Sequence, residues 1–371
     1  MIPPNLERSR PLIAVAMSSN HPVGDSQRFG KQGRRGYRMR LVQFKDVDGN
    51  RRVAVVSEDG SRLVCLKGVE SAYALAMEAL AAGTSLEAQV QSAGFDGEED
   101  YVRAYDEGRI LPPIDHPDPA HVYVTGTGLN HLGSAMARNA MHAKEKGDGA
   151  ELTDSMKMFQ WGMDGGKPEP GAVGVQPEWF YKGNGECIVP PGQPLEIPAF
   201  ALDGGDEAEV VGVYVIGPDG SVARVGYAVG NEFSDHVMEQ QNYLYLAHSK
   251  LRNCSLGPEL YVGELPEDVT GHVRVVRGGE TVWSAPFRTG EANMTHTIAN
   301  MEHHHFKYSM FRRPGDVHLH YFGASALSFS DGVTLRTGDV VEVTASIAHQ
   351  PLKNPIRVTE GPEAPVDVRQ L

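Results

Sequence analysis

EAEVVGVYVIG, residues 207–217, is the stretch of sequence that decides the fold. Two glutamates open a run of β-branched and aromatic residues, which is typical of a strand. Residues i and i+2 of a strand face the same side, so we expect the carboxylates of Glu207 and Glu209 to converge. Two like charges at that separation raise the pKa of one carboxyl unless a cation lies between them. Carboxylate ligation suits a hard ion such as Mg²⁺, Mn²⁺ or Ca²⁺.

The next predicted strand supplies a third acidic side chain. A second apolar run from Val222 leads to Asn231-Glu232, so Glu232 can return to the same end of the sheet as Glu207. Lys250 follows at a distance along the chain that lets it fold back onto this cluster, where it would hold a substrate carboxylate or transfer a proton. The alternative is an exposed strand end with solvated acids and a surface lysine, and spacing alone leaves it open.

Histidines offer a competing metal site. His303, His304 and His305 fall in a helical stretch, where consecutive side chains point about 100° apart and cannot converge on one ion. His318 and His320 alternate along a predicted strand and therefore share a face. They are either half of a zinc or iron site or the lining of a pocket.

The composition bounds the class of protein. The chain has 371 residues and a formal net charge of −14, so it lacks the positive footprint of proteins that bind nucleic acids or anionic membranes. Its 42 glycines and 24 prolines indicate many turns and favour a β-rich architecture. No apolar run approaches the ~20 residues that span a bilayer. The three cysteines lie far apart with no CxxC pair, which argues against a thiolate zinc site or a disulfide framework and fits a cytoplasmic location.

Changes in composition divide the chain into three predicted segments. Residues 1–38 are rich in Arg, Ser, Pro and Gly and are expected to be a disordered leader. We expect residues 39–117 to form a small N-terminal α+β domain and residues 118–371 to form a β-dominated catalytic domain. The polar stretch near residues 135–175 is expected to be a lid, because a long segment of this kind inside a compact domain usually has a function.

Individual elements follow from the apolar periodicity. In the N-terminal domain the predicted strands are residues 40–44, 51–57 and 62–66, followed by a helix over residues 69–81. In the catalytic domain the predicted strands are residues 122–124, 208–216, 222–229, 273–277, 317–322 and 340–346, and the one convincing helix covers residues 295–311.

In this order the motifs resemble the fumarylacetoacetate hydrolase superfamily. The matching pieces, spread over residues 122–355, are Gly128-Leu129-Asn130-His131, Glu207-Ala208-Glu209, Gly230-Asn231-Glu232-Phe233-Ser234, Lys250 and Pro314-Gly315-Asp316-Val317. The resemblance implies an α+β, β-dominated fold, with a β-roll catalytic domain behind a small N-terminal domain. It also implies a homodimer, metal ligands at Glu207, Glu209 and Glu232, and an active-site lysine at Lys250.

Three positions depart from the usual pattern of that superfamily. Glu232 stands where Asp is usual, and the extra methylene shifts the ion or changes its coordination. Ser134 stands near the position of the catalytic histidine of the hydrolases, which weakens a hydrolase assignment. His320-Tyr321-Phe322-Gly323 replaces a Thr-Gly-Thr segment, so the pocket wall is remodelled.

Two further motifs, GEANM at residues 290–294 and NEFSDH at residues 231–236, resemble a branch of bacterial pentose and sugar-acid catabolism, the 2-keto-3-deoxy-L-arabinonate dehydratases. This resemblance implies a metal-dependent lyase that converts a 2-keto-3-deoxy sugar acid to 2-oxoglutarate semialdehyde. The metal would bind the C1 carboxylate and the C2 carbonyl and would acidify the C3 protons. Two alternatives stay open: an acylpyruvate C–C hydrolase with the same metal, and a non-catalytic protein that binds sugar acids.

The residues expected to act on the substrate follow from this assignment. The candidate catalytic residues are Lys250, Ser134 and His142, of which His142 is a possible acid from the predicted lid. The candidate substrate-binding residues are Asn130, Lys182, Asn293 and His320. The expected partner is a small 2-oxo acid, with no nucleic acid and no membrane.

Overall fold

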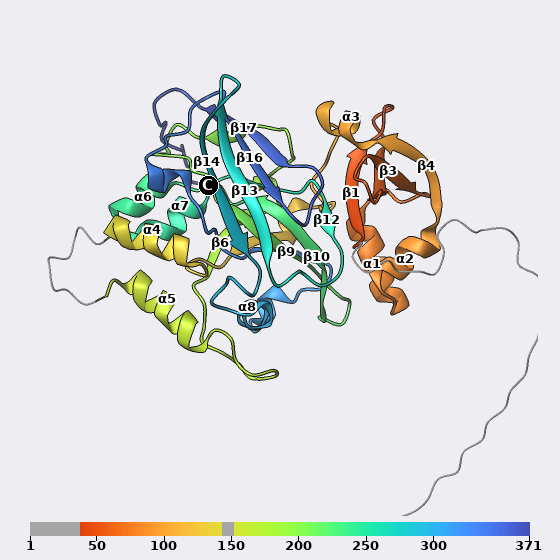
Figure 1. Ribbon diagram of the computed structural model, residues 1–371, viewed down its shortest axis with the longest axis horizontal. Coiled ribbons are helices and arrows are strands. Elements are labelled where there is room, and N and C mark those ends of the chain that lie inside the picture. Colours follow the sequence, from red (N-terminus) through yellow and green to blue (C-terminus); the bar gives the residue numbers. More distant parts are fainter. Residues whose placement is uncertain (1–37, 143–151) are drawn as a thin grey trace, which may run out of the picture. The chain divides into compact units, whose positions relative to one another are not determined.

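The computed structural model describes residues 38–142 and 152–371, without the side chains of residues 140–142 (Figure 1). The predicted leader lies outside the described residues except for Arg38, and so do residues 143–151 of the predicted lid. Arg38–Leu371 forms one compact unit. The boundary expected near residue 117 stays a prediction. Among the described residues, no helix is both long enough and apolar enough to cross a membrane.

The N-terminal part contains four antiparallel strands and three short helices. The strands are β1 (Arg40–Lys45), β2 (Arg51–Val56), β3 (Arg62–Leu66) and β4 (Phe95–Asp100), and the helices are α1 (Ala72–Ala82), α2 (Leu86–Ala93) and α3 (Tyr101–Asp106). The three strands predicted here are found to within one residue at each end, whereas β4, α2 and α3 were not predicted. The helix expected from residue 69 begins at Ala72, because the side chain of Ser71 caps it by accepting a hydrogen bond from the N–H of Ala74.

These strands continue into a 12-stranded sheet that carries the candidate site. Among the described residues the order is β4-β3-β2-β1-β12-β10-β9-β15-β5-β6, with β11 paired to β10 and β7 to β11. The further bounds are β5 (Val122–Gly126), β6 (Phe180–Asn184), β7 (Ile188–Val189), β9 (Ala208–Ile216), β10 (Val222–Asn231), β11 (Cys254–Leu256), β12 (Leu260–Tyr261) and β15 (Val317–Tyr321). β9 is antiparallel to both β10 and β15, and β15 is parallel to β5.

A second, five-stranded sheet packs against one face of β9 and β10, and its strands cross in front of them in Figure 1. Its order among the described residues is β14-β13-β16-β17-β8. The bounds are β8 (Leu195–Ile197), β13 (Val269–Arg277), β14 (Glu280–Thr289), β16 (Val340–Ala345) and β17 (Leu352–Val358). Val210 and Val229 of the first sheet share one buried core with Val273 and Val343 of the second.

β9 is buried along its whole length, which explains its nearly continuous apolar sequence. Val210 faces the core shared with the second sheet, whereas Val211 and Val213 belong to a core that includes Leu319 and, from α1, Leu75. Strands that are covered on both faces read as unbroken apolar runs. The start of β9, where the predicted ligands lie, is therefore also inside the molecule.

Both helices and strands differ from the sequence prediction. The strands that were not predicted in the second part of the chain are β6, β7, β8, β11, β12, β14 and β17. The helices of the second part of the chain are α4 (Leu132–His142), α5 (Asp154–Gly165), α6 (His236–Gln241), α7 (Leu246–Lys250) and α8 (Ile298–Phe306). The helices α4 and α5 fall in the stretch expected to be a lid. α8 lies within the predicted helix, and a 3₁₀ turn over Ser309–Phe311 follows it. α6 and α7 were not predicted, because helices of six and five residues are too short for a period of 3.6 to become visible.

Candidate metal and substrate site

Three carboxylates meet where β9 begins and β10 ends. Glu207 and Glu209 flank the first residue of β9, and Glu232 directly follows β10. Glu209 lies across from Gly230 in this antiparallel pair, so the two strand ends coincide. One oxygen of each carboxylate lies within 4.8 Å of those of the other two, and all three residues are buried. The predicted convergence is confirmed, and the alternative of solvated acids at an exposed strand end is wrong.

Lys250 bridges two of these carboxylates. It is the last residue of α7 and is 1 % exposed. Its Nζ donates to Oε1 of Glu207 at 2.6 Å and also to Oε2 of Glu232. The same Nζ donates to Oγ of Ser234 at 3.1 Å and lies 4.7 Å from the centroid of the Phe180 ring. Lys250 is therefore a buried cation of the acidic cluster and not a surface lysine.

A second buried lysine holds the third carboxylate. Lys182 in β6 pairs through Nζ with Oε1 of Glu232 at 2.7 Å. It also donates to the carbonyls of Phe233 at 2.6 Å and Lys250 at 3.0 Å. These contacts use the three donors of the ammonium group. The geometry thus gives Lys182 a positioning role toward Glu232, and its expected role in substrate binding stays a prediction.

Burial and neighbouring charges set the protonation of the cluster. Burial and then the carboxylates of Glu232 and Glu207 raise the pKa of Glu209 well above its ordinary value. Burial and the Glu207 carboxylate raise the pKa of Glu232 to about 7. Burial also acts to raise the pKa of Glu207, but Lys250 and His236 outweigh it and lower this pKa. Burial acts to lower the pKa of Lys250, but Glu207 and Glu232 outweigh it and raise this pKa.

The donor set fits a divalent cation. Oε2 of Glu209 accepts a hydrogen bond from the N–H of Gly323 at 2.7 Å, whereas Oε1 is buried and has no hydrogen-bond partner among the described residues. Leaving a buried polar oxygen unpaired is costly, and a cation shared with Glu207 and Glu232 would satisfy it. A group of three carboxylates, without sulfur or imidazole, matches the hard ions Mg²⁺, Mn²⁺ and Ca²⁺.

His236 adds a further polar group beside the cluster. It is the first residue of α6, it is buried, and its Nε2 donates to Oε1 of Glu207 at 3.0 Å. The side chain of Asp235 caps α6 by accepting from the N–H of Met238 at 2.9 Å, which turns the chain into a helix directly after Glu232. Burial acts to lower the pKa of His236, but the hydrogen bond to Glu207 outweighs it and raises this pKa.

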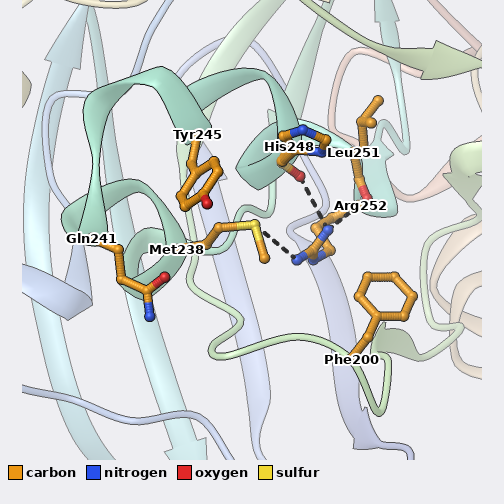
Figure 2. Close-up of a pocket in the computed structure, with 7 residues that line it drawn as sticks. All are labelled: Phe200, Met238, Gln241, Tyr245, His248, Leu251 and Arg252. Carbon is orange, nitrogen blue, oxygen red and sulfur yellow. Dashed lines mark hydrogen bonds between the residues drawn. The ribbon is translucent and has the colours of Figure 1, made fainter. Parts of the chain in front are cut away.

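Arg252 ties α6 to α7 on the side away from the carboxylates. Its Nη2 donates to Oδ2 of Asp235 at 2.8 Å, and its Nη1 donates to the carbonyls of His248 at 3.2 Å and Leu251 at 2.9 Å. Figure 2 shows this guanidinium reaching toward Met238 in a pocket of about 430 Å³. The residues that line this pocket are Phe200, Met238, Gln241, Tyr245, His248, Leu251 and Arg252, and none of them lines the cavity at the carboxylates. Arg252 therefore holds the ends of the two helices that present His236 and Lys250.

A small cavity opens onto the carboxylates. Its lining residues are Gly128, Leu129, Ser134, Arg138, Phe180, Glu207, Glu209, His236, Glu239, Lys250, Gly323, Ala324 and Leu327. Its volume of about 20 Å³ has room for one water molecule or ion. A sugar acid is much larger, so its entry requires the walls to move apart.

α4 forms one wall of this cavity. A Cβ at Gly133 would lie 2.0 Å from the carbonyl oxygen of Ser325, so only glycine permits this close approach of the helix. Ser134 follows, lines the cavity, and donates from Oγ to the carbonyl of His131 at 3.1 Å. Its catalytic role stays a prediction. His142 is the last residue of α4, and its side chain lies outside the described residues.

Arg138, also from α4, gathers two more carboxylates. Its Nη1 donates to both oxygens of Glu178 at 2.6 and 2.7 Å, and its Nε pairs with Oε1 of Glu239 at 2.6 Å. Arg138 and Glu239 line the same cavity as Glu209. A Cβ at Gly128 would lie 1.8 Å from Oε2 of Glu178, so this glycine makes room for the pair. Sequence reasoning missed the group, because its members come from three separate segments and no spacing connects them.

Two predicted substrate-binding residues, Asn130 and Asn293, bond to other groups of the protein away from the cavity lining. Oδ1 of Asn130 accepts hydrogen bonds from the N–H groups of Thr295 at 3.1 Å and His296 at 3.0 Å. Nδ2 of Asn130 donates to the carbonyl of Phe322 at 3.0 Å. Nδ2 of Asn293 donates to Oδ1 of Asp268 at 2.8 Å and to the carbonyl of Thr289 at 2.9 Å. Neither asparagine lines the cavity at the carboxylates, so their contact with substrate stays a prediction.

His318 and His320 share a face of β15, as expected. The ring of His305 from α8 lies 5.0 Å from each of theirs, centroid to centroid. His320 lies between the hydroxyls of Thr125 and Thr127, both at 2.8 Å, and does not line the cavity at the carboxylates, so its substrate-binding role also stays a prediction. Burial lowers the pKa of all three imidazoles, to about 4 for His305. Within the described part of the chain, only the carboxylate group brings three metal-type ligands to one point, so the zinc or iron alternative lacks a third ligand.

Comparison with known proteins places the fold. No protein-family model and no curated protein sequence matches this chain. A 2-keto-3-deoxyarabinonate dehydratase in a hexagonal crystal form is similar, with a TM-score of 0.64 and 19% identity over 87% of this chain and 100% of that one. A 2-keto-3-deoxy-D-arabinonate dehydratase in complex with magnesium and 2,5-dioxopentanoate has a TM-score of 0.62 and 18% identity over the same shares.

A 5-carboxymethyl-2-hydroxymuconate delta-isomerase from Mycobacterium smegmatis is also similar, with a TM-score of 0.53 and 19% identity over 86% of this chain and 100% of that one. At such identities the likeness establishes the fold. The chain has the strand-dominated α+β fold of these proteins. The fold expected from the resemblance to the fumarylacetoacetate hydrolase superfamily is therefore confirmed.

Proposed function

On the premise of this shared fold, we propose that the protein is a divalent-metal-dependent dehydratase of a 2-keto-3-deoxy sugar acid. The observation that carries the proposal is the buried group of Glu207, Glu209 and Glu232 with Lys250 beside it. A protein of the same fold binds magnesium and 2,5-dioxopentanoate. That compound is 2-oxoglutarate semialdehyde, the product expected from the sequence motifs.

The residues of the chain suit this reaction. Glu207, Glu209 and Glu232 would hold the cation, which when bound supplies Lewis-acid activation of the 2-oxo group. The raised pKa of Lys250 keeps this side chain protonated at neutral pH. A cation bound to Glu207 and Glu232 would free the Nζ donors that now bond these carboxylates, and a freed donor can hold the C1 carboxylate. The raised pKa of His236 favours its protonated form as well. Loss of the C4 hydroxyl as water needs such a proton donor.

The acylpyruvate hydrolase remains the second candidate, because it would use the same metal. It needs a group that activates water, and at the position near which the hydrolases carry their histidine this chain has Ser134, whose hydroxyl donates to a backbone carbonyl. A dehydratase needs no activated water. The expected homodimer and cytoplasmic location stay predictions.

The test is turnover by the purified protein with Mg²⁺. We would supply 2-keto-3-deoxy-L-arabinonate, its D-isomer and acetylpyruvate separately and follow 2-oxoglutarate semialdehyde or acetate by NMR. The motifs favour the L-isomer, whereas the dehydratase of similar fold is named for the D-isomer. We expect formation of the semialdehyde, its loss in EDTA, and its loss in Glu209→Gln. The exposed Glu280→Gln in β14 is the matched control. Consumption of acetylpyruvate alone would reject the dehydratase, and activity that survives EDTA would reject both candidates.

A further inference from the structure

Two groups of charged side chains with opposite formal net charge lie at the candidate cavity, and we call the group at Glu207, Glu209 and Glu232 its metal end. At the metal end, three carboxylates and the ammonium groups of Lys182 and Lys250 would, with a divalent cation, leave one positive charge. In the second group, among the described residues, Glu178 and Glu239 both pair with the guanidinium of Arg138 and leave one negative charge. Once the walls move apart to admit a ligand, an anionic group of that ligand meets attraction at the metal end and repulsion beside Glu178 and Glu239.

The group formed by Arg138, Glu178 and Glu239 is a built part of the protein. The side chains of Arg138, Glu178 and Glu239 are 13 %, 15 % and 4 % exposed. Glu178 pairs with Arg138 through both carboxylate oxygens, and Glu239 pairs with its Nε. Charge-assisted bonds of this kind are short and directional, so Nη1 and Nε of the guanidinium are already engaged by carboxylates of the protein itself.

This group belongs to the same cavity as the metal ligands. Arg138 and Glu239 line it together with Glu207 and Glu209. Glu209 is 1 % exposed and its Oε1 has no hydrogen-bond partner among the described residues, which marks the metal end as a place where a ligand completes the structure. A 2-oxo acid bound there by its carboxylate and carbonyl would extend its remaining carbons along the cavity wall that Arg138 and Glu239 help to form.

We propose that Arg138, Glu178 and Glu239 select 2-oxo acids with one carboxylate and an uncharged, hydroxylated tail, and that they exclude dicarboxylic 2-oxo acids. Carboxylate oxygens accept hydrogen bonds from hydroxyl groups. A second substrate carboxylate would instead face two like charges whose counterion is already shared, and like charges placed together discriminate strongly between ligands. The inference rests on the proposed function, because it places the first carboxylate of the substrate at the metal end.

Binding of two matched acids tests this without turnover. 2-Oxopentanoate and 2-oxoglutarate both have five carbons, and they differ in the charge of the tail. Each is titrated by calorimetry into the Mg²⁺-loaded full-length protein. We expect 2-oxopentanoate to bind at least about tenfold more tightly than 2-oxoglutarate, a ratio that corresponds to about 1.4 kcal/mol.

Charge variants then show which residues cause the difference. Glu239→Gln and Glu178→Gln each remove one negative charge at nearly constant shape, and each should lower the ratio of affinities by about tenfold. Arg138→Gln removes the positive charge and should raise the ratio. Glu280→Gln, exposed in β14, should leave it unchanged. Retained binding of 2-oxopentanoate shows that a variant is folded with its metal end intact.

The outcomes separate the two proposals. Equal affinity of the wild type for both acids would overturn the charge selection and leave the proposed function standing. The same holds if the ratio of the two affinities does not change with the charge removed in the variants. Binding of neither acid to the Mg²⁺-loaded wild type would overturn the proposed function and the selection with it. A ratio that falls in both glutamine variants and rises in Arg138→Gln supports the selection.

Discussion

Replacing Lys250 with methionine tests how the buried site is held together. Nζ of Lys250 pairs with the carboxylates of Glu207 and Glu232, whose side chains are 10 % and 0 % exposed. Methionine keeps much of the volume of lysine but none of its charge. Removing one partner of a buried ion pair costs about 3–5 kcal/mol, because the other charge stays buried without compensation. We therefore expect Lys250→Met to lower the free energy of unfolding by about 3–5 kcal/mol in EDTA.

A divalent cation should restore part of this loss, since it supplies positive charge to the same carboxylates. A ligand that binds only the folded state stabilises it by about 2.7 kcal/mol at 100 times its Kd. Urea unfolding followed by circular dichroism, with EDTA and with saturating Mg²⁺, measures both quantities. The gain on adding Mg²⁺ should be larger for Lys250→Met than for the wild type.

Lys353→Met is the matched control. Lys353 pairs with Glu342 at 3.3 Å, and its side chain is 40 % exposed. Exposed ion pairs contribute about 0–1 kcal/mol, so this variant should be nearly as stable as the wild type. The reasoning is refuted if Lys250→Met costs no more than the control in EDTA, or if Mg²⁺ stabilises neither the variant nor the wild type.

Three further predictions concern other parts of the chain. The pKa of Glu232 is raised from 4.5 to about 7 in the folded protein. Between these two pH values the folded state therefore binds more protons than the unfolded state. The contribution of Glu232 to the free energy of unfolding falls as the pH rises from 4.5 to about 7. Urea unfolding in EDTA should show this slope in the wild type and a smaller one in Glu232→Gln, and equal slopes would contradict it. Gly133→Ala places a Cβ 2.0 Å from the carbonyl oxygen of Ser325, so α4 must shift. We expect the free energy of unfolding, measured in urea, to fall by about 1–3 kcal/mol, and turnover to fall more than Mg²⁺ affinity. An unchanged unfolding midpoint would contradict the close approach of α4 to Ser325. The Sγ atoms of Cys187 and Cys254 lie 3.9 Å apart, so hydrogen peroxide should oxidise the two thiols to a disulfide with release of two waters, and peptide mass spectrometry that finds both cysteines alkylated after this treatment would show the prediction to be wrong.

Part of the fold was readable from local patterns. Residues 208–216 were predicted as a strand with the bounds that β9 has. This succeeds because burial on both faces requires an unbroken apolar run, which is visible in neighbouring residues. α6 and α7 were missed because fewer than two helical turns leave no clear period in the sequence. The order of strands in the two sheets came only from the structure.

The sequence by itself determined that Glu207 and Glu209 face the same side, because alternation along a strand is a property of the local backbone. It also placed Glu232 within reach of them, because an antiparallel return brings the end of one strand to the start of the other. Only the tertiary structure decided that Arg138 meets Glu178 and Glu239, and that Arg138 and Glu239 line the same cavity as Glu207 and Glu209. These side chains come from segments separated by tens of residues. Their meeting depends on how α4, α6 and the segment before β6 pack against one another, and no spacing along the chain encodes that packing.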